Sequence, residues 1–487
     1  MIWTKSDLEA LVKELFSGHH FLVISNRQPY EHVQVGPRIE VRRPPGGVVT
    51  GVDPVMRAAG GTWLAVAGGS ADRKVVDASG RVKVPPGEES YTLQRIWLTK
   101  EEMDGYYFGF SNEALWPLCH VAYHRPAFTV EDWQDYVDVN RKMANAALEV
   151  VGDSPAVIFV QDYHLALLPR FVKEARPDIR VAHFWHIPWP NFENFRICPN
   201  KEALIEGMLG SDLLGFHIRH HCNNFLYTVD NTIETRTDRE RTSIFFRGHE
   251  TLVRSFPIGV DFDGLGASVE EEPDDAREKL KHEFGVAGKL VLSVDRIDYT
   301  KGIPERLLAI DRFLEENPGW HGKVTFLQVG ALSRMRIAAY KQINDEVNAL
   351  VEEVNWKYGQ ESWQPVVLTR RHVPYHEILT LYRMADAVIV SSLHDGMNLV
   401  AKEFISCRRD EDGVLILSRF TGAARELEGG ALTINPYDRV EVAGAIGEAL
   451  GMARGRRRRR MKMMREKVRA NNIFRWAGKI LQELARI

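Results

Sequence analysis

Short apolar, β-branched runs alternate with amphipathic stretches along most of the chain. In the second half, this pattern predicts buried strands, with helices between them, at residues 289–294, 323–329, 365–369, 387–391, 413–418 and 431–434. In the first half, it predicts a helix over residues 4–17 and strands at 21–24, 155–160, 181–185 and 252–257. Two successive blocks of strand–helix alternation predict an α/β protein with two doubly wound domains facing one cleft.

The alternation is interrupted between residues 267 and 283, where the sequence becomes strongly charged around Pro273. A charge run of this kind marks a boundary between domains. We therefore expect an N-terminal domain over 1–262 and a C-terminal domain over 263–463. The final stretch, 464–487, has an amphipathic pattern and is expected to form a helix that docks back on the N-terminal domain.

Composition narrows the classes of function. Apolar residues make up 44% of the 487 residues, charged residues make up 26%, and the net charge is −3. These values are typical of a soluble globular protein and give no electrostatic case for nucleic acid or a membrane as the main partner. No apolar run is long enough to cross a membrane, and the N-terminus lacks a signal-peptide pattern. The four cysteines are widely spaced, so we expect reduced thiols in a cytoplasmic protein.

The segment 387–405 has the strongest chemical signal. An apolar strand runs into a turn that contains Gly396 and Asn398, and a helix begins at Leu399. Free N–H groups and the helix dipole make such a turn an anion site. Asp395 lies in the mouth of the turn, and Glu403 lies about two helical turns deeper on the same face. A carboxylate at each end suits a nucleotide sugar, whereas a simple helix cap by Asp395 is the alternative.

Polar residues also follow other predicted strands, at the edge where α/β sheets bind ligands. Arg27, Asp162 and His186 follow strands of the first half, although each could instead form a surface salt bridge or cap a helix. Arg296 and Lys301 follow the strand at 289–294 and could neutralise a diphosphate without a metal; a charged surface loop is the alternative.

Other segments allow two interpretations. The Gly46-Gly47 pair could let backbone approach a ligand or could be a plain loop. The aromatic residues between 104 and 117 could stack on sugar rings or could form core. Residues 217–222 hold three histidines and a cysteine, which we interpret as a solvated helix start rather than a metal site. The five arginines 456–460 could bind anions, but a solvated helix face is favoured because methionines flank them.

Taken together, these segments resemble the trehalose-6-phosphate synthase family, the retaining glycosyltransferases of family 20, which have a GT-B fold with two Rossmann-like domains facing a central cleft. The resemblance runs from residue 23 to the C-terminal helix. The motifs that carry it are Ser25-Asn26-Arg27, Gly46-Gly47, Phe110-Ser111-Asn112, Leu115-Trp116-Pro117, Asp162-Tyr163-His164, His186-Ile187-Pro188, Arg296 to Gly302, Tyr358-Gly359-Gln360, Asp395 to Glu403 and Asn435-Pro436-Tyr437-Asp438.

The resemblance implies a role for each matching residue. The phosphate end of the acceptor, glucose 6-phosphate, would be held by Arg27, Tyr107, Trp116 and Arg334, and the acceptor hydroxyls by Asp162. His186 would contact the donor glucose near the reacting carbon, and Arg296 and Lys301 the diphosphate. The remaining donor contacts would come from Gly47, Asp395, Gly396, Met397, Asn398, Leu399, Val400 and, at the ribose, Glu403.

The implied activity is transfer of glucose from UDP-glucose to glucose 6-phosphate, with retention, to give α,α-trehalose 6-phosphate and UDP. No metal or other cofactor is expected, and a homo-oligomer, dimer or tetramer, is compatible with the sequence. One departure concerns the acceptor: the family commonly has a tryptophan where Val66 or a neighbour aligns. A glucosylglycerol-phosphate synthase, using glycerol 3-phosphate and UDP- or ADP-glucose, is therefore an alternative. A non-catalytic sugar-phosphate sensor is a second one, although the intact Arg296, Lys301, Asp395 and Glu403 argue against it.

Overall fold

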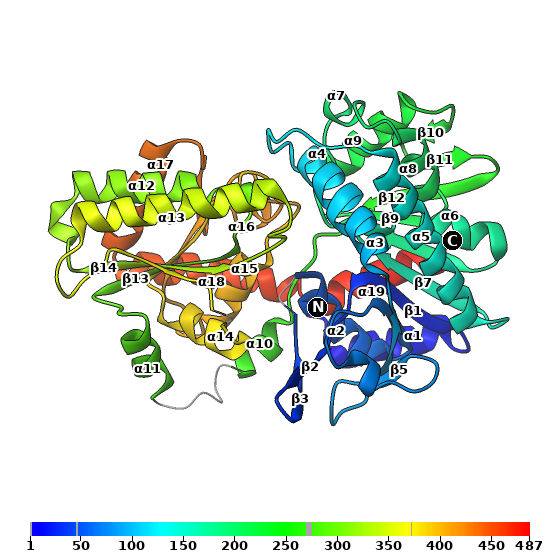
Figure 1. Cartoon of the computed structure of the whole chain (residues 1–487), viewed down its shortest axis with the longest axis horizontal. Helices are drawn as coiled ribbons and strands as arrows, with labels where there is room; N and C mark the ends of the chain where they lie inside the picture. Colours follow the sequence, from blue (N-terminus) through cyan, green and yellow to red (C-terminus); the bar gives the residue numbers. More distant parts are fainter. Residues whose placement is uncertain (1, 45–46, 269–274, 372) are drawn as a thin grey trace. The chain divides into compact units, whose positions relative to one another are not determined.

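The computed structural model describes residues 2–44, 47–268, 275–371 and 373–487 (Figure 1). The chain divides into two compact units, Met1–Gly259 with Asn472–Ile487, and Val260–Asn471. Below they are called unit 1 and unit 2. Gly46, most of the acidic run around Pro273, and residue 372 lie outside the described residues.

The chain returns to unit 1 later than the sequence pattern predicts. The stretch 464–487 is not one helix: α18 (Arg454–Ala470) belongs to unit 2, and α19 (Ile473–Ala485) belongs to unit 1. Asn472 separates the two helices because its side chain caps the N-terminus of α19. The side chain accepts a hydrogen bond from the N–H of Arg475 at 3.0 Å. The same side chain donates to the carbonyl of Trp3 at 2.6 Å, which ties the start of α19 to the N-terminus.

Unit 1 is built on a sheet whose central strands are parallel. The strand order is β10-β11-β12-β9-β8-β7-β1-β4-β6-β5, and only β5, β10 and β11 pair antiparallel. The strands are β1 (His20–Arg27), β4 (Thr62–Val66), β5 (Arg81–Val84), β6 (Tyr91–Ile96), β7 (Ala156–Gln161), β8 (Arg180–Phe184), β9 (Leu213–Phe216), β10 (Arg236–Asp238), β11 (Ser243–Phe246) and β12 (His249–Ser255). The four strands predicted in this half therefore exist, as β1, β7, β8 and β12.

The helices of unit 1 follow the strands in the expected alternation. They are α1 (Lys5–Phe16), α2 (Gly47–Ala59), α3 (Lys100–Glu102), α4 (Trp116–His120), α5 (Val130–Val151), α6 (Leu168–Ala175), α7 (Phe192–Phe195), α8 (Lys201–Met208), α9 (Arg219–Asp230) and α19. The short 3-10 turns η1 (Asp72–Lys74) and η3 (Tyr163–Leu165) join them, and η2 (Met103–Leu115) is a π-helix. Long π-helices are rare and cluster at functional sites.

One segment of unit 1 was not predicted, and one expectation needs correction. The segment between Gln28 and Arg43 forms a hairpin, β2 (Glu31–Val35) and β3 (Arg38–Arg42), closed by Gly36 and a proline. Residues 217–222 do begin a helix, α9, but they are only partly solvated. Both His217 and His221 are buried, and His221 contacts the carbonyl of Trp189.

Unit 2 carries a fully parallel six-stranded sheet in the order β15-β14-β13-β16-β17-β18. Numbered from its first strand, this is 3-2-1-4-5-6, the order of dinucleotide-binding folds. The strands are β13 (Lys289–Arg296), β14 (Val324–Ala331), β15 (Val366–Thr369), β16 (Ala387–Val390), β17 (Val414–Ser418) and β18 (Leu432–Ile434). All six match the predicted strands, because strands covered on both faces are continuous apolar runs.

Helices cover both faces of this sheet. Figure 1 shows α12 and α13 on one side and α14 on the other. The helices are α10 (Phe262–Ser268), α11 (Ala276–Glu283), α12 (Ile303–Glu316), α13 (Ala338–Tyr358), α14 (Tyr375–Met384), α15 (Leu399–Cys407), α16 (Ala424–Leu427), α17 (Arg439–Gly451) and α18; η4 (Tyr299–Lys301) and η5 (Pro318–Trp320) are 3-10 turns. Both units are thus doubly wound α/β, which confirms the predicted class.

The arginine run lies on α18, as the favoured interpretation predicts. Met461 and Met464 are buried on one face of this helix. Arg457 pairs with Asp412 at 2.5 Å, and Arg460 donates to the carbonyl of Gly430 at 2.8 Å. Arg456, Arg458 and Arg459 are exposed, so the run is a largely solvated helix face from which Arg457 and Arg460 reach the rest of unit 2. None of the helices in the described part of the chain is long and apolar enough to cross a membrane.

Candidate active site

In each unit, two of the predicted site residues lie at the point where the strand order reverses. In unit 2 this point falls between β13 and β16, and Arg296 and Asp395 follow these two strands. In unit 1 it falls between β1 and β7, where Arg27 and Asp162 stand at the strand ends. The crevice outside the carboxyl ends of strands at such a point is where open α/β sheets bind ligands.

In unit 2, backbone and hydroxyl contacts join the turn after β13 to the end of β16. The N–H of Leu393 donates to the carbonyl of Thr300 at 2.8 Å, and the Ser391 hydroxyl lies 3.0 Å from the carbonyl of Gly302. Gly302 has φ +61, and a Cβ there would lie 2.3 Å from the Ser391 carbonyl oxygen. Only glycine suits this close approach in the left-handed region.

This junction brings together two residues that lie far apart in the sequence. The ammonium of Lys301 is 2.8 Å from Oδ2 of Asp395, and both side chains are largely buried. The Ser392 hydroxyl and the Asn398 amide also donate to that oxygen, at 3.2 and 3.3 Å. The predicted diphosphate and donor-sugar residues are therefore direct neighbours, with one cation and one anion in contact.

Asn398 shapes the start of α15. Its φ of +123 lies outside the usual range for a residue with a side chain, and its Oδ1 accepts from the N–H of Ala401 at 3.0 Å. The turn residues Gly396 and Met397 are buried, and Leu399 and Val400 form the partly exposed first turn. The helix N-terminus that sequence predicts as an anion site is thus present and capped by an asparagine side chain.

Glu403 lies on the same helix and is buried. It accepts hydrogen bonds from the hydroxyls of Tyr375 and Tyr382, at 3.1 and 3.3 Å. Burial raises the pKa of Glu403 to about 7, although the two tyrosine hydroxyls oppose this shift. Sequence reasoning did not find either tyrosine, because both come from α14 and only the fold brings them to α15.

Arg334 belongs to a buried cluster in unit 2. Its side chain lies 3.6 Å from Oδ2 of Asp298 and 2.5 Å from the hydroxyl of Tyr340, which also donates to Asp298 at 3.0 Å. Burial would raise the pKa of Asp298, but the nearby charges of Arg334, Arg296 and Lys301 outweigh it and keep the pKa low. Asp298 is therefore an anion whose charge is favoured by three cations at this edge of the sheet.

In unit 1, the ends of β7 and β8 are joined at His186. Oδ1 of Asp162 accepts from the N–H of His186 at 3.2 Å, and Oε1 of Gln161 lies 2.9 Å from the Nε2 of the same histidine. His183 contacts the carbonyl of Asp162 at 3.1 Å. Burial lowers the pKa of His186 to about 3 and that of His183 to about 4, so both rings are neutral at ordinary pH.

The predicted aromatic residues lie on η2 and at the start of α4. The Tyr107 ring stacks on His164 with 5.8 Å between centroids, and Trp116 packs on Tyr163 at 5.9 Å. The Tyr163 hydroxyl donates to Asn112 at 2.8 Å. These rings form part of the core, and the partly exposed Tyr107 also borders the strand-end edge.

Arg27, Gly47 and Val66 complete the predicted set in unit 1. Arg27 ends β1 after a register shift opposite β4, whose last residue is the buried Val66. Gly47 is the exposed first residue of α2. Sequence reasoning missed Glu31 of β2, which lies close enough to interact with Arg27. Burial raises the pKa of Glu31, and the charge of Arg27 opposes that shift.

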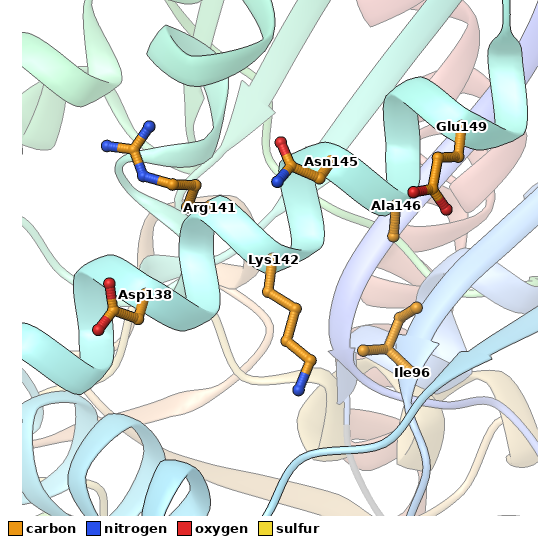
Figure 2. Close-up of a pocket in the computed structure, with 7 residues that line it drawn as sticks. All are labelled: Ile96, Asp138, Arg141, Lys142, Asn145, Ala146 and Glu149. Carbon is orange, nitrogen blue, oxygen red and sulfur yellow. The ribbon is translucent and has the colours of Figure 1, made fainter.

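A shallow pocket also lies in unit 1 and contains none of the predicted residues. Figure 2 shows that its side chains come mostly from α5, with cations and acids interspersed. It is lined by Ile96, Asp138, Arg141, Lys142, Asn145, Ala146 and Glu149. Lys142 pairs with Glu102 at 2.9 Å. Within the described ranges, no group of three or more histidine, cysteine or acidic side chains could hold a metal ion.

Comparison with known proteins agrees with this geometry. The model of "Glycosyltransferase family 20" matches residues 19–486. The chain is 37% identical to a trehalose-6-phosphate synthase of Mycolicibacterium vanbaalenii over 96% of both chains, and 35% identical to one of Mycobacterium tuberculosis, covering 97% of this chain and 96% of that one.

Solved structures show the same similarity. A trehalose-6-phosphate protein of E. coli "bound with UDP-2-fluoro glucose" aligns with a TM-score of 0.85 and 31% identity, covering 96% of this chain and 99% of that chain. A UDP-forming α,α-trehalose-phosphate synthase of Burkholderia xenovorans in complex with glucose-6-phosphate aligns with a TM-score of 0.85, 30% identity and the same coverage.

Proposed function

Because the chain belongs to glycosyltransferase family 20, we propose that it transfers glucose from UDP-glucose to glucose 6-phosphate and so forms α,α-trehalose 6-phosphate and UDP. The relatives named for this synthase cover nearly the whole chain, which favours this reaction over a glucosylglycerol-phosphate synthase or a sensor. The observation that carries the proposal is the cluster of Arg296, Lys301, Asp395 and Glu403 at the topological switch point of unit 2.

These residues suit a nucleotide sugar. A diphosphate bound at the N-terminus of α15 would meet the helix dipole and the charges of Arg296 and Lys301. Asp395 would accept hydrogen bonds from sugar hydroxyls beside the ammonium of Lys301. Glu403 would accept from the ribose hydroxyls. Among the relatives, the E. coli structure carries a fluorinated UDP-glucose, a ligand of the same chemical class.

Chemistry requires the bond between glucose and the diphosphate to loosen. Arg296 and Lys301 would stabilise the negative charge that develops on the leaving phosphate, where electrostatic help has the largest effect. That phosphate could accept the proton of the acceptor hydroxyl from the same face, which gives retention without a protein base. The neutral His186 agrees with a role in orientation rather than proton transfer. We propose that neither a metal nor another cofactor takes part.

For the acceptor, Asp162 of unit 1 would bind hydroxyls, and Arg27, Tyr107 and Trp116 of the same unit would hold the phosphate end. Arg334 of unit 2 is also proposed as a phosphate ligand. A doubly charged phosphate monoester is best held by guanidinium groups, since they can donate two parallel hydrogen bonds.

Parallel reactions test the proposal. UDP-glucose is incubated with glucose 6-phosphate in one reaction and glycerol 3-phosphate in the other, and UDP release and product mass are measured. Product only from glucose 6-phosphate supports the synthase. Product preferentially from glycerol 3-phosphate would overturn the acceptor assignment, and tight UDP binding without any product would support the sensor.

A further inference from the structure

Gln161 is a fully buried polar residue beside the predicted site. It is the last residue of β7, and its Oε1 lies 2.9 Å from Nε2 of His186. Its own amide nitrogen is buried and has no hydrogen-bond partner among the described residues. Burying an amide N–H group without a hydrogen-bond partner costs free energy of folding. The position of Gln161 therefore needs a structural or functional explanation.

The Gln161 contact determines where the proton of His186 lies. A neutral imidazole carries one N–H and one bare nitrogen. The low pKa of about 3 that burial gives His186 keeps the ring neutral. Because an amide oxygen only accepts, Nε2 must carry the proton that it donates to Oε1 of Gln161, and Nδ1 is then the acceptor.

The backbone geometry explains how the end of β7 contacts both the main-chain N–H and the ring of His186. Successive side chains of a regular strand point to opposite faces. Asp162 departs from the strand with φ +73, and both it and Gln161 contact His186, one at the main-chain N–H and the other at the ring. A residue other than glycine in that region is strained by about 1–3 kcal/mol. The strain is compensated by these contacts.

Packing fixes the plane of the same ring. His186 lies against Phe184 with 4.6 Å between centroids, against His217 at 5.3 Å, and against Trp476 of α19 at 6.3 Å. Aromatic packing resists rotation of the imidazole but does not choose its tautomer. Among the contacts of the ring with the described residues, the hydrogen bond with Gln161 can make this choice.

We propose that Gln161 is a positioning residue that holds His186 in the Nε2–H tautomer, so that Nδ1 offers a lone pair to a hydroxyl of the bound sugar. The use of that lone pair rests on the proposed glucosyl transfer, whereas the tautomer itself does not. An Nδ1–H tautomer would present a donor instead and would repel a hydroxyl hydrogen at the same position.

Nitrogen NMR of the histidine rings tests the tautomer without any substrate. The full chain, labelled with nitrogen-15 in histidine, is recorded at mildly alkaline pH, and the His186 signal is identified by its loss in His186→Gln. Wild type is expected to show protonated Nε2. Gln161→Met, which keeps the length of the side chain and removes the acceptor, is expected to shift His186 toward Nδ1–H. Gln161→Glu, which keeps an acceptor oxygen, is expected to restore Nε2–H.

The same spectra contain an internal reference. His183 contacts the main-chain carbonyl of Asp162, which no Gln161 variant removes, so its tautomer is expected to stay unchanged. Gln94 gives the matched control variant. It is a nearly buried glutamine on β6 of the same sheet and contacts Arg81 and the Ser79 carbonyl. Gln94→Met removes two side-chain hydrogen bonds away from His186 and is expected to leave the His186 tautomer unchanged.

Kinetics then measure the consequence. Gln161→Met is expected to lower kcat by about tenfold to a hundredfold, as loss of a residue that orients a ligand does elsewhere, with Gln161→Glu recovering part of it. A wild-type spectrum with protonated Nδ1, or a Gln161→Met spectrum in which the His186 signals match those of the wild type, would overturn the proposal. If the tautomer shifts as expected but the wild type transfers no glucose, the positioning role stands and the proposed function fails.

Discussion

The side chains at the carboxyl ends of the strands differ in charge between the two units. In unit 2, at the ends of β13 and β16, cations form ion pairs with carboxylates. In unit 1, at the ends of β7 and β8, the histidines are neutral. Lys301 touches Asp395 and Arg334 approaches Asp298 in unit 2. In unit 1, His186 is held by an amide and lies among aromatic rings. Both edges have the same kind of topology, so the difference lies in the side chains and not in the fold.

The difference matches two different tasks. A leaving diphosphate gains charge during transfer, and paired cations that are already in place can stabilise it with little reorganisation. A sugar ring gains no such charge at its hydroxyls, and neutral, rigid groups bind these without a large desolvation cost. Under the proposed function, the two edges would separate charge stabilisation from orientation, and each prediction below perturbs one of them.

Removing the Arg296 guanidinium is expected to have the largest effect. Arg296→Ala should lower kcat for glucosyl transfer by about 10²–10³-fold, the usual result of deleting one donor to a developing anion. The residue ends β13 and is partly exposed, so the fold should remain. UDP release gives the rate, and a thermal melt followed by circular dichroism checks folding.

The control for Arg296 is another arginine of unit 2. Arg312 lies on α12 and pairs with Glu316 at the surface, at 2.7 Å. Arg312→Ala should leave turnover within about twofold, since exposed pairs contribute little. Wild-type turnover in Arg296→Ala would remove this residue from charge stabilisation.

The raised pKa of Glu403 predicts a pH dependence of stability that arises at the carboxyl ends of β13 and β16, the charged edge of unit 2. Below pH 4.5 the carboxyl is protonated in both the folded and the unfolded state. As pH rises, the unfolded chain loses this proton first, while the buried group keeps it up to its pKa of about 7. The contribution of Glu403 to the free energy of unfolding should therefore fall between about pH 4.5 and 7, by about 3 kcal/mol at most.

Urea unfolding of wild type and Glu403→Gln across this range isolates the effect. The variant has no carboxyl proton to lose at this position. The difference in the free energy of unfolding, variant minus wild type, should therefore grow with pH and level off above about pH 7. Glu316→Gln, on the exposed face of α12, should show no such trend. Asp412, whose pKa the Arg457 hydrogen bonds lower to about 2, acts only below this window. A difference that does not vary with pH would contradict the perturbed pKa.

Gly302 tests the junction that brings Lys301 to Asp395. Gly302→Ala adds a Cβ in the left-handed region and 2.3 Å from the Ser391 carbonyl, so unfolding should become easier by about 2–3 kcal/mol. Gly319→Ala is the matched control, because nothing lies within 4 Å of the added atom. Its effect should stay within about 0.5 kcal/mol. Equal effects of the two changes would show that the close approach is not needed.

Much of the architecture follows from the sequence, for a physical reason. Strands covered on both faces are continuous apolar runs, so all six strands of unit 2 could be predicted. The hairpin of β2 and β3 was not predicted: Ile39 and Val41 of β3 alternate with charged residues, but β3 is exposed along its whole length and forms no buried face. The π-helix η2 was also missed, since no residue spacing distinguishes it from an α-helix.

The site shows the same limit. The position of several candidate residues at strand ends could be predicted, because strand ends are visible in the sequence. Their roles in ligand binding stay predictions. Their contacts could not be predicted: Lys301 and Asp395 lie 94 positions apart, and Tyr340 reaches Asp298 from α13. Gln161 stands next to a predicted residue, yet its role depends on where His186 lies in three dimensions.

The smallest effect is expected for Arg334, and it sharpens the comparison of the two edges. If this guanidinium binds the acceptor phosphate, Arg334→Ala should raise the KM for glucose 6-phosphate about tenfold, with Arg27 still present, and change the KM for UDP-glucose little. Arg27→Ala should give the same selective effect from unit 1. Because Arg334 also approaches Asp298, the variant should lose some stability, which Tyr340→Phe reproduces by removing a neighbouring hydrogen bond to Asp298. If Arg334→Ala and Tyr340→Phe change both KM values equally, Arg334 serves the charged edge of unit 2 and not the acceptor.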